Sequence, residues 1–142
     1  MNILIINGPN LNLLGTRNPG VYGTGTLDEL NAFLIESFPE HDLTFFQSNV
    51  EGEIINRLQL AMEDGTEGLV SNLGAYTHTS VALRDALEPI AFPKVEVHIS
   101  NIHAREEFRE KSLTGEVMSG IITGFGKHSY VLGINAVQYL AK

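Results

Sequence analysis

The chain has 142 residues, of which 43% are hydrophobic and 18% charged, the composition of an ordinary globular protein long enough to bury one core. Its formal net charge is −8, with only nine Lys and Arg residues. Binding to nucleic-acid phosphates or to an anionic membrane surface needs clustered Lys and Arg. We therefore expect one domain spanning residues 1–142, with neither nucleic acid nor membrane as a partner.

Cysteine is absent, which excludes disulfides, thiolate zinc sites and a cysteine nucleophile. The sequence starts with a strand-like apolar segment, residues 1–6, without the basic segment and apolar run of a secretory signal. No apolar stretch approaches the ~20 residues that a membrane-spanning helix needs. We expect a cytoplasmic protein.

Short apolar runs alternate with helical patterns along the chain, beginning with an expected strand at residues 3–7. Thr26 and Glu29 then have the spacing of a capping box, which starts a helix that ends near Pro39. The other expected strands are residues 43–47, 68–72, 95–99 and 117–122, and the other expected helices are residues 50–62, 79–87, 105–111 and 130–140.

Five strands that alternate with five helices predict a parallel sheet with helices on both faces. At this length the expected α/β fold is the flavodoxin-like doubly wound sheet with strand order 2-1-3-4-5. Ligands of such sheets bind beyond the carboxyl ends of the strands, near the switch point between strands 1 and 3. Chemistry is therefore expected in the segments that follow strands 1, 3 and 4.

The segment after strand 1, residues 8–25, is far longer than the usual ~2–6 residues of a βα loop, and such loops are often lids. We expect a lid at about residues 16–25 that carries Arg17 and Tyr22. A nearby guanidinium lowers the pKa of a tyrosine from ~10 and so makes it a base. Two other interpretations stay open: an ordinary mobile loop, or a phosphate cradle at residues 23–26 without a P-loop lysine.

The segment after strand 3 places Asn72 at a strand end and His78 at a helix start, where both could contact a ligand. Thr79 or Ser80 could simply cap that helix. Arg84 and Asp85 follow in the helix, where such residues are most often solvated or salt-bridged.

Strand 4 carries Glu96 and His98, which share one face and interrupt an otherwise apolar run. Because an ionised Glu is rarely buried without a partner, we expect it to orient the imidazole and to favour its protonated form, as a general acid requires. A structural pair, or a metal site with His103, are the alternatives.

Arg105 and Arg109 follow, four residues apart. We expect them on one helix face, either reaching toward an anionic or polyhydroxylated ligand or neutralised by neighbouring glutamates.

The motifs in these segments resemble those of the type II 3-dehydroquinate dehydratases. The first is NGPNLNLLG at residues 7–15, followed by R-x-P-x-x-Y-G at residues 17–23. GAYTHTS at 74–80, EVHISN at 96–101 and AREEFR at 104–109 match the other motifs in order and spacing. The resemblance covers essentially the whole chain.

The resemblance implies a lyase that reversibly dehydrates 3-dehydroquinate to 3-dehydroshikimate in the shikimate or quinate pathway. It implies no cofactor, no metal and no lysine Schiff base. It also implies a homododecamer built as a tetramer of trimers.

The resemblance also assigns roles to residues. Tyr22 corresponds to the base that removes the C2 proton, and Arg17 to the arginine that favours tyrosinate. His98 corresponds to the acid that protonates the C1 hydroxyl, Glu96 to its partner, and Asn10 to the residue near the enolate oxygen. The residues that correspond to substrate contacts are Asn72, His78, Arg109, the backbone of Ile99 and Ser100, and Asp85 from across a subunit boundary.

Three positions depart from the family's pattern. Leu73 stands in place of Pro or Ala, and Asn18 in place of a frequent Glu. Residues 112–116 lack the usual Ser-Pro, which affects local geometry.

A binding or signalling module without catalysis is the rival from another class. A receiver-type phosphorylation site needs acidic residues at the end of strand 1, where this chain has Asn7, Gly8 and Pro9. An FMN site needs a Ser/Thr-rich loop at the same place, which residues 11–14 do not provide.

Overall fold

The computed structural model describes residues 1–16, 18–22 and 25–142, those at 19 and 22 by their backbone only. The sheet consists of parallel strands in the order β2-β1-β3-β4-β5. The predicted doubly wound α/β fold and its strand order are therefore confirmed. The strands are β1 (Asn2–Asn7), β2 (Asp42–Gln47), β3 (Gly68–Asn72), β4 (Lys94–His98) and β5 (Gly120–Thr123).

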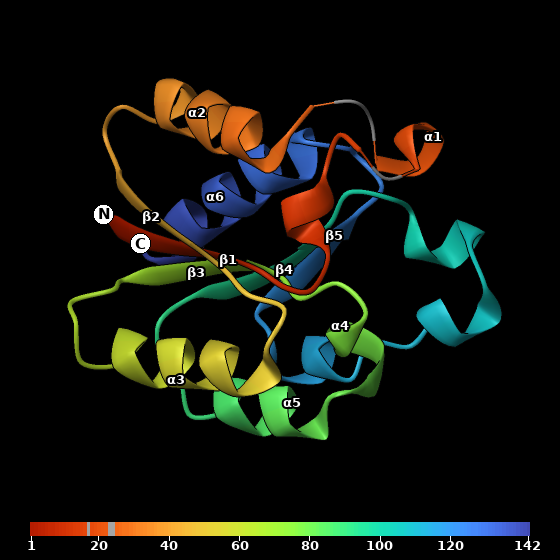
Figure 1. Cartoon of the computed structure of the whole chain (residues 1–142). Coiled ribbons are helices and arrows are strands. Elements are labelled where there is room, and N and C mark those ends of the chain that lie inside the picture. Colours follow the sequence, from red (N-terminus) through yellow and green to blue (C-terminus); the bar gives the residue numbers. More distant parts are fainter. Residues whose placement is uncertain (17, 23–24) are drawn as a thin grey trace.

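Helices cover both faces of the sheet (Figure 1). On one face lie α2 (Leu27–Ser37) and α6 (His128–Leu140), and on the other lie α3 (Glu51–Ala61) and α5 (Val81–Leu87). Two short helices, α1 (Pro19–Tyr22) and α4 (Tyr76–Thr79), lie in the loops that follow β1 and β3.

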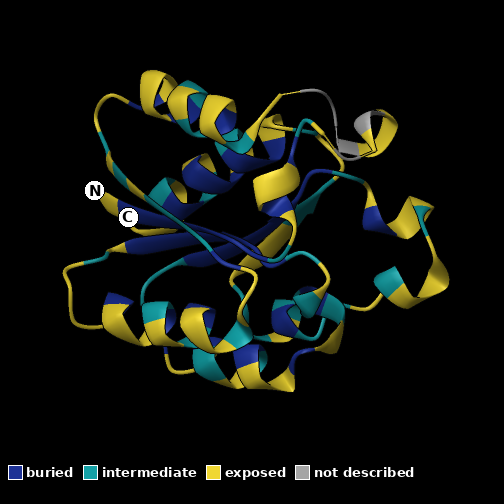
Figure 2. Ribbon diagram, viewed as in Figure 1, coloured by how far each residue is buried: buried dark blue, intermediate teal, exposed yellow. Residues whose placement is uncertain are grey.

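The strands bury both of their faces, because successive side chains alternate between the two helical layers. In β1, Ile3 and Ile5 belong to the core under α2 and α6, whereas Leu4 and Ile6 belong to the core under α3 and α5. Figure 2 shows the resulting pattern: the central strands are buried and the helices expose their outer sides.

The predicted capping box is present, because Thr26 Oγ1 accepts from Glu29 N–H and the Glu29 carboxylate accepts from Thr26 N–H. The helix expected at residues 79–87 is instead two helices, α4 and α5. Ser80 separates them, and its hydroxyl caps α5 by accepting from Leu83 N–H at 2.9 Å.

One predicted element was wrong, and another begins later in the chain than predicted. Residues 105–111 do not form an α-helix but follow one 3-10 turn, Ile102–Ala104, and contain another, Glu107–Arg109. The segment is largely exposed and has too few apolar side chains to bury a helix face. The strand predicted at residues 117–122 begins only at Gly120, because Val117 ends a 3-10 turn, Thr114–Val117, that packs against α5.

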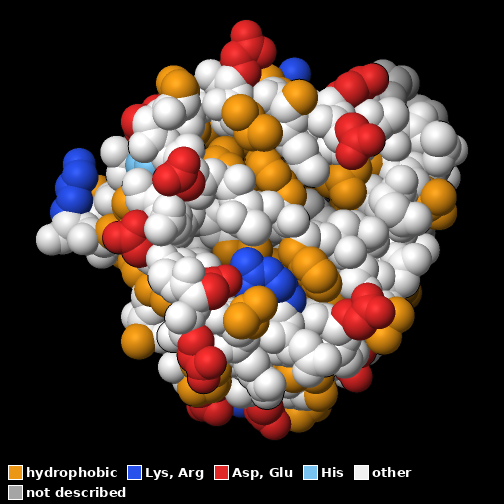
Figure 3. Space-filling model, turned by 60° about the vertical axis from the view of Figure 1, so that its left-hand side comes forward, with side chains coloured by type: hydrophobic (Ala, Val, Ile, Leu, Met, Phe, Trp, Pro, Cys, Tyr) orange, Lys and Arg blue, Asp and Glu red, His pale blue; other side chains and the backbone are white. Residues whose placement is uncertain are grey.

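The surface agrees with the acidic composition. On the face shown in Figure 3, acidic side chains outnumber Lys and Arg. Among the described residues, no helix combines the length and apolarity needed to cross a membrane.

Candidate active site

The parallel register brings the carboxyl ends of β1, β3 and β4 to one edge of the sheet. Asn7 is paired with Asn72, and β4 ends next to them at His98. A cavity of about 80 Å³ opens at this edge. Seven of the predicted site residues line it: Asn10, Asn72, His78, His98, Ile99, Ser100 and Arg109.

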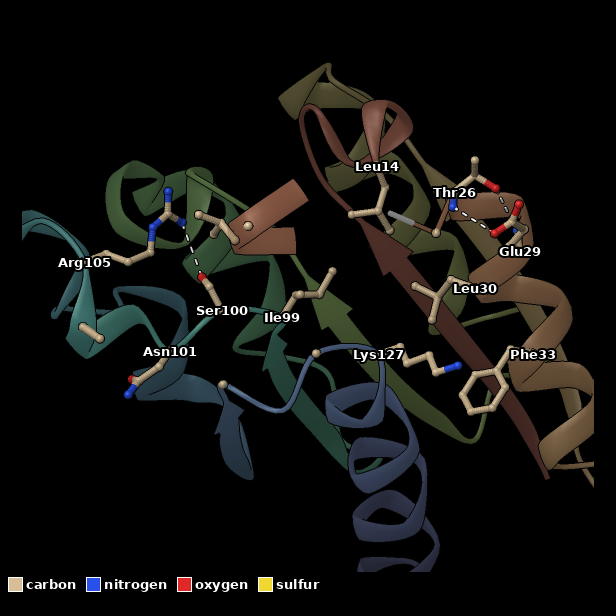
Figure 4. A pocket seen from close by; sticks show the side chains of 16 residues that line it. Leu14, Thr26, Glu29, Leu30, Phe33, Ile99, Ser100, Asn101, Arg105 and Lys127 are labelled. Atoms are coloured by element: carbon tan, nitrogen blue, oxygen red, sulfur yellow. Dashed lines mark hydrogen bonds between the residues drawn. The ribbon is translucent and has the colours of Figure 1, made fainter. Parts of the chain in front are cut away.

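This small cavity continues into a wider one of about 560 Å³, with Leu14, Ile99, Ser100 and Arg105 shared between them. In Figure 4, Arg105 and Ser100 approach the wider cavity from one side, and Leu30 and Phe33 of α2 lie on the other. Gly20 and Val21 of α1 also line it. The described residues of α1 therefore border the space next to the site.

The predicted contact between Glu96 and His98 is confirmed. His98 Nε2 lies 3.0 Å from Glu96 Oε2, and both residues are buried. Burial alone would raise the pKa of the Glu96 carboxyl, but hydrogen bonds from His98, Thr114 and Ser112, together with the charge of His98, hold that pKa below its usual value. Glu96 is thus a buried carboxylate that remains ionised and orients the imidazole.

Two hydroxyl groups complete the surroundings of Glu96, and sequence reasoning missed both. Ser112 Oγ donates at 2.8 Å to Oε2, and Thr114 Oγ1, which is fully buried, donates to Oε1. Gly115 N–H in turn donates to Ser112 Oγ at 2.8 Å. Residues 112–116 therefore supply two of the donors that hold the buried carboxylate.

His78 stacks on His98, with ring centroids 6.2 Å apart and an interplanar angle of 22°. Its Nδ1 lies 2.7 Å from the carbonyl oxygen of Lys111, so Nδ1 carries the proton. Burial lowers the pKa of His78, although the Lys111 carbonyl partly opposes this. His78 is therefore held neutral and leaves Nε2 as an acceptor for a ligand hydroxyl.

A buried hydrogen-bond chain lies behind Asn72. Its Nδ2 donates at 2.9 Å to the hydroxyl of Tyr130, and that hydroxyl donates at 2.5 Å to Asn7 Oδ1. Asn72 Oδ1 accepts from Gly74 N–H at 3.2 Å. The sequence predicted Tyr130 only as part of the last helix.

Asn10 is held in the left-handed region at φ 69°, a conformation that Asn adopts more readily than most residues. Its backbone N–H donates at 2.9 Å to Asn49 Oδ1, and the Asn49 carbonyl accepts from the Tyr76 hydroxyl at 2.8 Å. The loop after β2 thus ties the loop after β1 to α4. Nothing in the sequence alone indicated Asn49.

The two arginines reach the cavity without the helix predicted for them. Arg109 lines it while its Nε donates at 2.8 Å to Glu106 Oε2. Arg105 lines it as well and donates at 3.4 Å to Ser100 Oγ. Arg109 is therefore paired with a glutamate, as one of the two interpretations predicted, and it also lines the cavity.

Four predicted residues are not among those that line the cavity. Glu96 contacts the cavity residue His98 instead, Asp85 lies elsewhere, and no side chain is described for the other two. The side chain of Asp85 is 63% exposed on α5 and pairs with Arg84 at 3.2 Å. Arg17 lies outside the described residues, and Tyr22 is described only by its backbone in α1.

Among the described residues, the structure offers no set of side chains that could bind a metal ion. Within residues 1–16, 18–22 and 25–142, no three His, Asp or Glu side chains gather closely enough to hold an ion. Glu96 and His98 instead use one another as partners, and His103 is exposed in the turn after β4.

Comparisons with known proteins agree over nearly the whole chain. The family model described as "Dehydroquinase class II" matches residues 1–138. A 3-dehydroquinate dehydratase of Pelodictyon phaeoclathratiforme is 54% identical over 139 residues, covering 96% of this chain and 91% of that protein. Another, of Exiguobacterium sp., is 55% identical over 138 residues, covering 96% and 94%. The crystal structure of type II dehydroquinase from Butyrivibrio crossotus has a TM-score of 0.95 at 45% identity, covering 97% of each chain.

Proposed function

This chain belongs to the class II dehydroquinase family, and on that premise we propose that it catalyses the reversible dehydration of 3-dehydroquinate to 3-dehydroshikimate in the shikimate pathway. Both bacterial relatives are named 3-dehydroquinate dehydratase. The observation in this chain that carries the proposal is the buried Glu96–His98 pair beside a cavity that Asn72, His78 and Arg109 also line.

His98 acts as the general acid. Glu96 holds one ring nitrogen at 3.0 Å, so the second nitrogen delivers a proton to the C1 hydroxyl, which leaves as water. The ionised carboxylate stabilises the imidazolium before that transfer. Because His78 is neutral and stacked on His98, it adds no second positive charge next to the acid.

Tyr22 acts as the base that removes the C2 proton, α to the ketone, and Arg17 stabilises its phenolate. A guanidinium is suited to this because it stays charged at every relevant pH. Support comes from Gly20 and Val21, whose helix α1 lines the wider cavity next to the site. Residues 16–25 would then form a lid that excludes water when substrate binds.

The remaining cavity residues bind the substrate. Asn10 stabilises the negative charge that develops on the enolate oxygen. Removing one positioned donor of this kind typically lowers kcat by about 10²–10³-fold. The backbone N–H groups of Ile99 and Ser100 hold the carboxylate, and Asn72, His78 and Arg109 bind the hydroxyl groups and the carboxylate from the cavity wall. No step requires a metal or an organic cofactor.

The subunit arrangement completes the proposal. We propose a homododecamer, a tetramer of trimers, in which Asp85 reaches the site of a neighbouring subunit. Its exposed position on α5, outside the lining of its own chain's cavity, supports that role.

The deciding experiment adds 3-dehydroquinate to the purified protein and follows the conjugated enone of the product by ultraviolet absorbance. Tyr22→Phe should abolish turnover and leave the fold and substrate binding largely intact, because only the phenolic oxygen is lost. A wild-type protein that forms no enone would overturn the proposed function. A Tyr22→Phe enzyme with near-normal rate would overturn only the assignment of the base.

A further inference from the structure

Tyr130 is a fully buried side chain behind the cavity, with no exposed surface. It projects from α6 to the place where β1 and β3 end, and its hydroxyl lies between Asn7 and Asn72, which are partners in the sheet register. The hydroxyl thus connects a helix on one face of the sheet to the residues from which the site is built.

The direction of each hydrogen bond in this group is fixed. Asn7 Oδ1 can only accept, so the Tyr130 hydroxyl must donate to it and accept from Asn72 Nδ2. Burial raises the pKa of Tyr130, so the phenol keeps the proton that it donates. At the other end of the amide, Asn72 Oδ1 accepts from Gly74 N–H.

These contacts leave the Asn72 amide a single orientation. If the amide were flipped, its NH₂ group would face the N–H of Gly74, so that two donors would oppose each other. Its oxygen would face the Tyr130 hydroxyl, whose proton is already donated to Asn7, so that two acceptors would oppose each other. In the observed orientation one Nδ2 hydrogen is used by Tyr130, which leaves the second for a ligand in the cavity that Asn72 lines.

We propose that Tyr130 is a positioning residue that acts on the reaction through Asn72. It does so by fixing which way round the Oδ1 and Nδ2 atoms of that amide are presented to the substrate. This inference rests on the proposed function. Tyr130 lies behind the cavity wall and touches no substrate, so its effect requires Asn72.

The test is a double-mutant cycle of Tyr130→Phe, Asn72→Ala and the pair, with kcat and KM measured for each. Tyr130→Phe keeps the ring and removes only the hydroxyl. A misoriented contact far from the chemistry can cost up to about 100-fold. We expect kcat/KM to fall by about 10-fold, mostly through KM. In the Asn72→Ala background the same change should have almost no effect on kcat/KM, because the amide through which Tyr130 acts is already absent.

If Tyr130 served only the folding of the chain, Tyr130→Phe would lower kcat/KM by the same factor in the wild-type and in the Asn72→Ala background. That result would overturn the inference while the proposed function stands. A wild-type enzyme that forms no product would overturn the proposed function first and this inference with it. Tyr139→Phe is the matched control, since Tyr139 lies on the same helix and is 76% exposed, and it should leave both constants unchanged.

A second variant covers the case in which Tyr130→Phe is not recovered folded. Asn7→Ala removes the acceptor that sets the direction of the Tyr130 hydroxyl, and Asn7 does not line the small cavity. Its effect on kcat/KM should likewise disappear in the Asn72→Ala background. An equal effect in both backgrounds would overturn the inference.

Discussion

The carboxylate of Glu96 offers a sharp test of how this site is held together. Thr114→Val replaces a fully buried hydroxyl that donates to Glu96 Oε1 by a methyl group of similar size. A hydrogen bond to a charged group contributes ~1.5–3 kcal/mol. Because Ser112 still lies 3.1 Å from the same oxygen and would keep part of that contact, we expect the free energy of unfolding at pH 7 to fall by about 2 kcal/mol.

The pH dependence distinguishes this mechanism from a packing defect. The pKa of Glu96 lies below its usual value of 4.5 in the folded protein. The ionised carboxylate therefore stabilises the fold above pH 4.5, and that contribution disappears as the pH falls through the lowered folded-state pKa. Thr114→Val should raise the folded-state pKa, so its destabilisation should be largest near pH 7 and shrink as the pH falls below 4.5.

Urea unfolding measured at a series of pH values tests this prediction. With an m-value of about 2 kcal/mol/M, the midpoint at pH 7 should fall by roughly 1 M. Thr77→Val is the matched control: Thr77 is equally buried, and its hydroxyl has no partner among the described residues, so this variant should not be destabilised. Equal losses in the two variants, or a loss in Thr114→Val that does not change with pH, would refute the reasoning.

Two further predictions concern the chemistry. Arg17→Lys should lower kcat severely in the ultraviolet assay, because an ammonium cannot reproduce the planar guanidinium beside the phenolate, and an enzyme that kept most of its rate would argue against that pairing. Prolonged treatment with a chelator should leave turnover unchanged, since the described residues bring no three His, Asp or Glu side chains together, and a loss of rate restored by a divalent cation would contradict a metal-free mechanism.

Much of the fold follows from patterns along the chain. The alternation of short apolar runs with helical periodicity predicts the doubly wound sheet, because a strand covered on both faces must be apolar throughout. The failures occur where this signal is weak. Residues 105–111 carry charge on nearly every position, and Val117 is apolar because it packs against α5 rather than because it belongs to a strand.

Site residues could be predicted where they interrupt the apolar or amphipathic pattern of the strand or helix that carries them. Glu96 and His98 are conspicuous because charged side chains interrupt a buried strand, and their contact follows from a spacing of two residues. Tyr130 and Asn49 carry no such signal. The ring of Tyr130 is indistinguishable from other apolar residues of a core helix, and its partner Asn72 is 58 positions away.

Residues 112–116 show that the site depends on the chemistry of its side chains rather than on a sequence motif. A buried carboxylate needs donors, and it does not matter whether the segment that provides them contains a proline. Ser112 and Thr114 meet this requirement, and the backbone of Gly115 donates to Ser112 and thereby orients its hydroxyl toward Glu96. A Cβ at position 115 would come within 2.4 Å of Ile121 and 2.9 Å of Ser112 Oγ, so the missing side chain lets this turn close on Glu96. Residues 112–116 therefore hold the Glu96 carboxylate, which in turn orients His98.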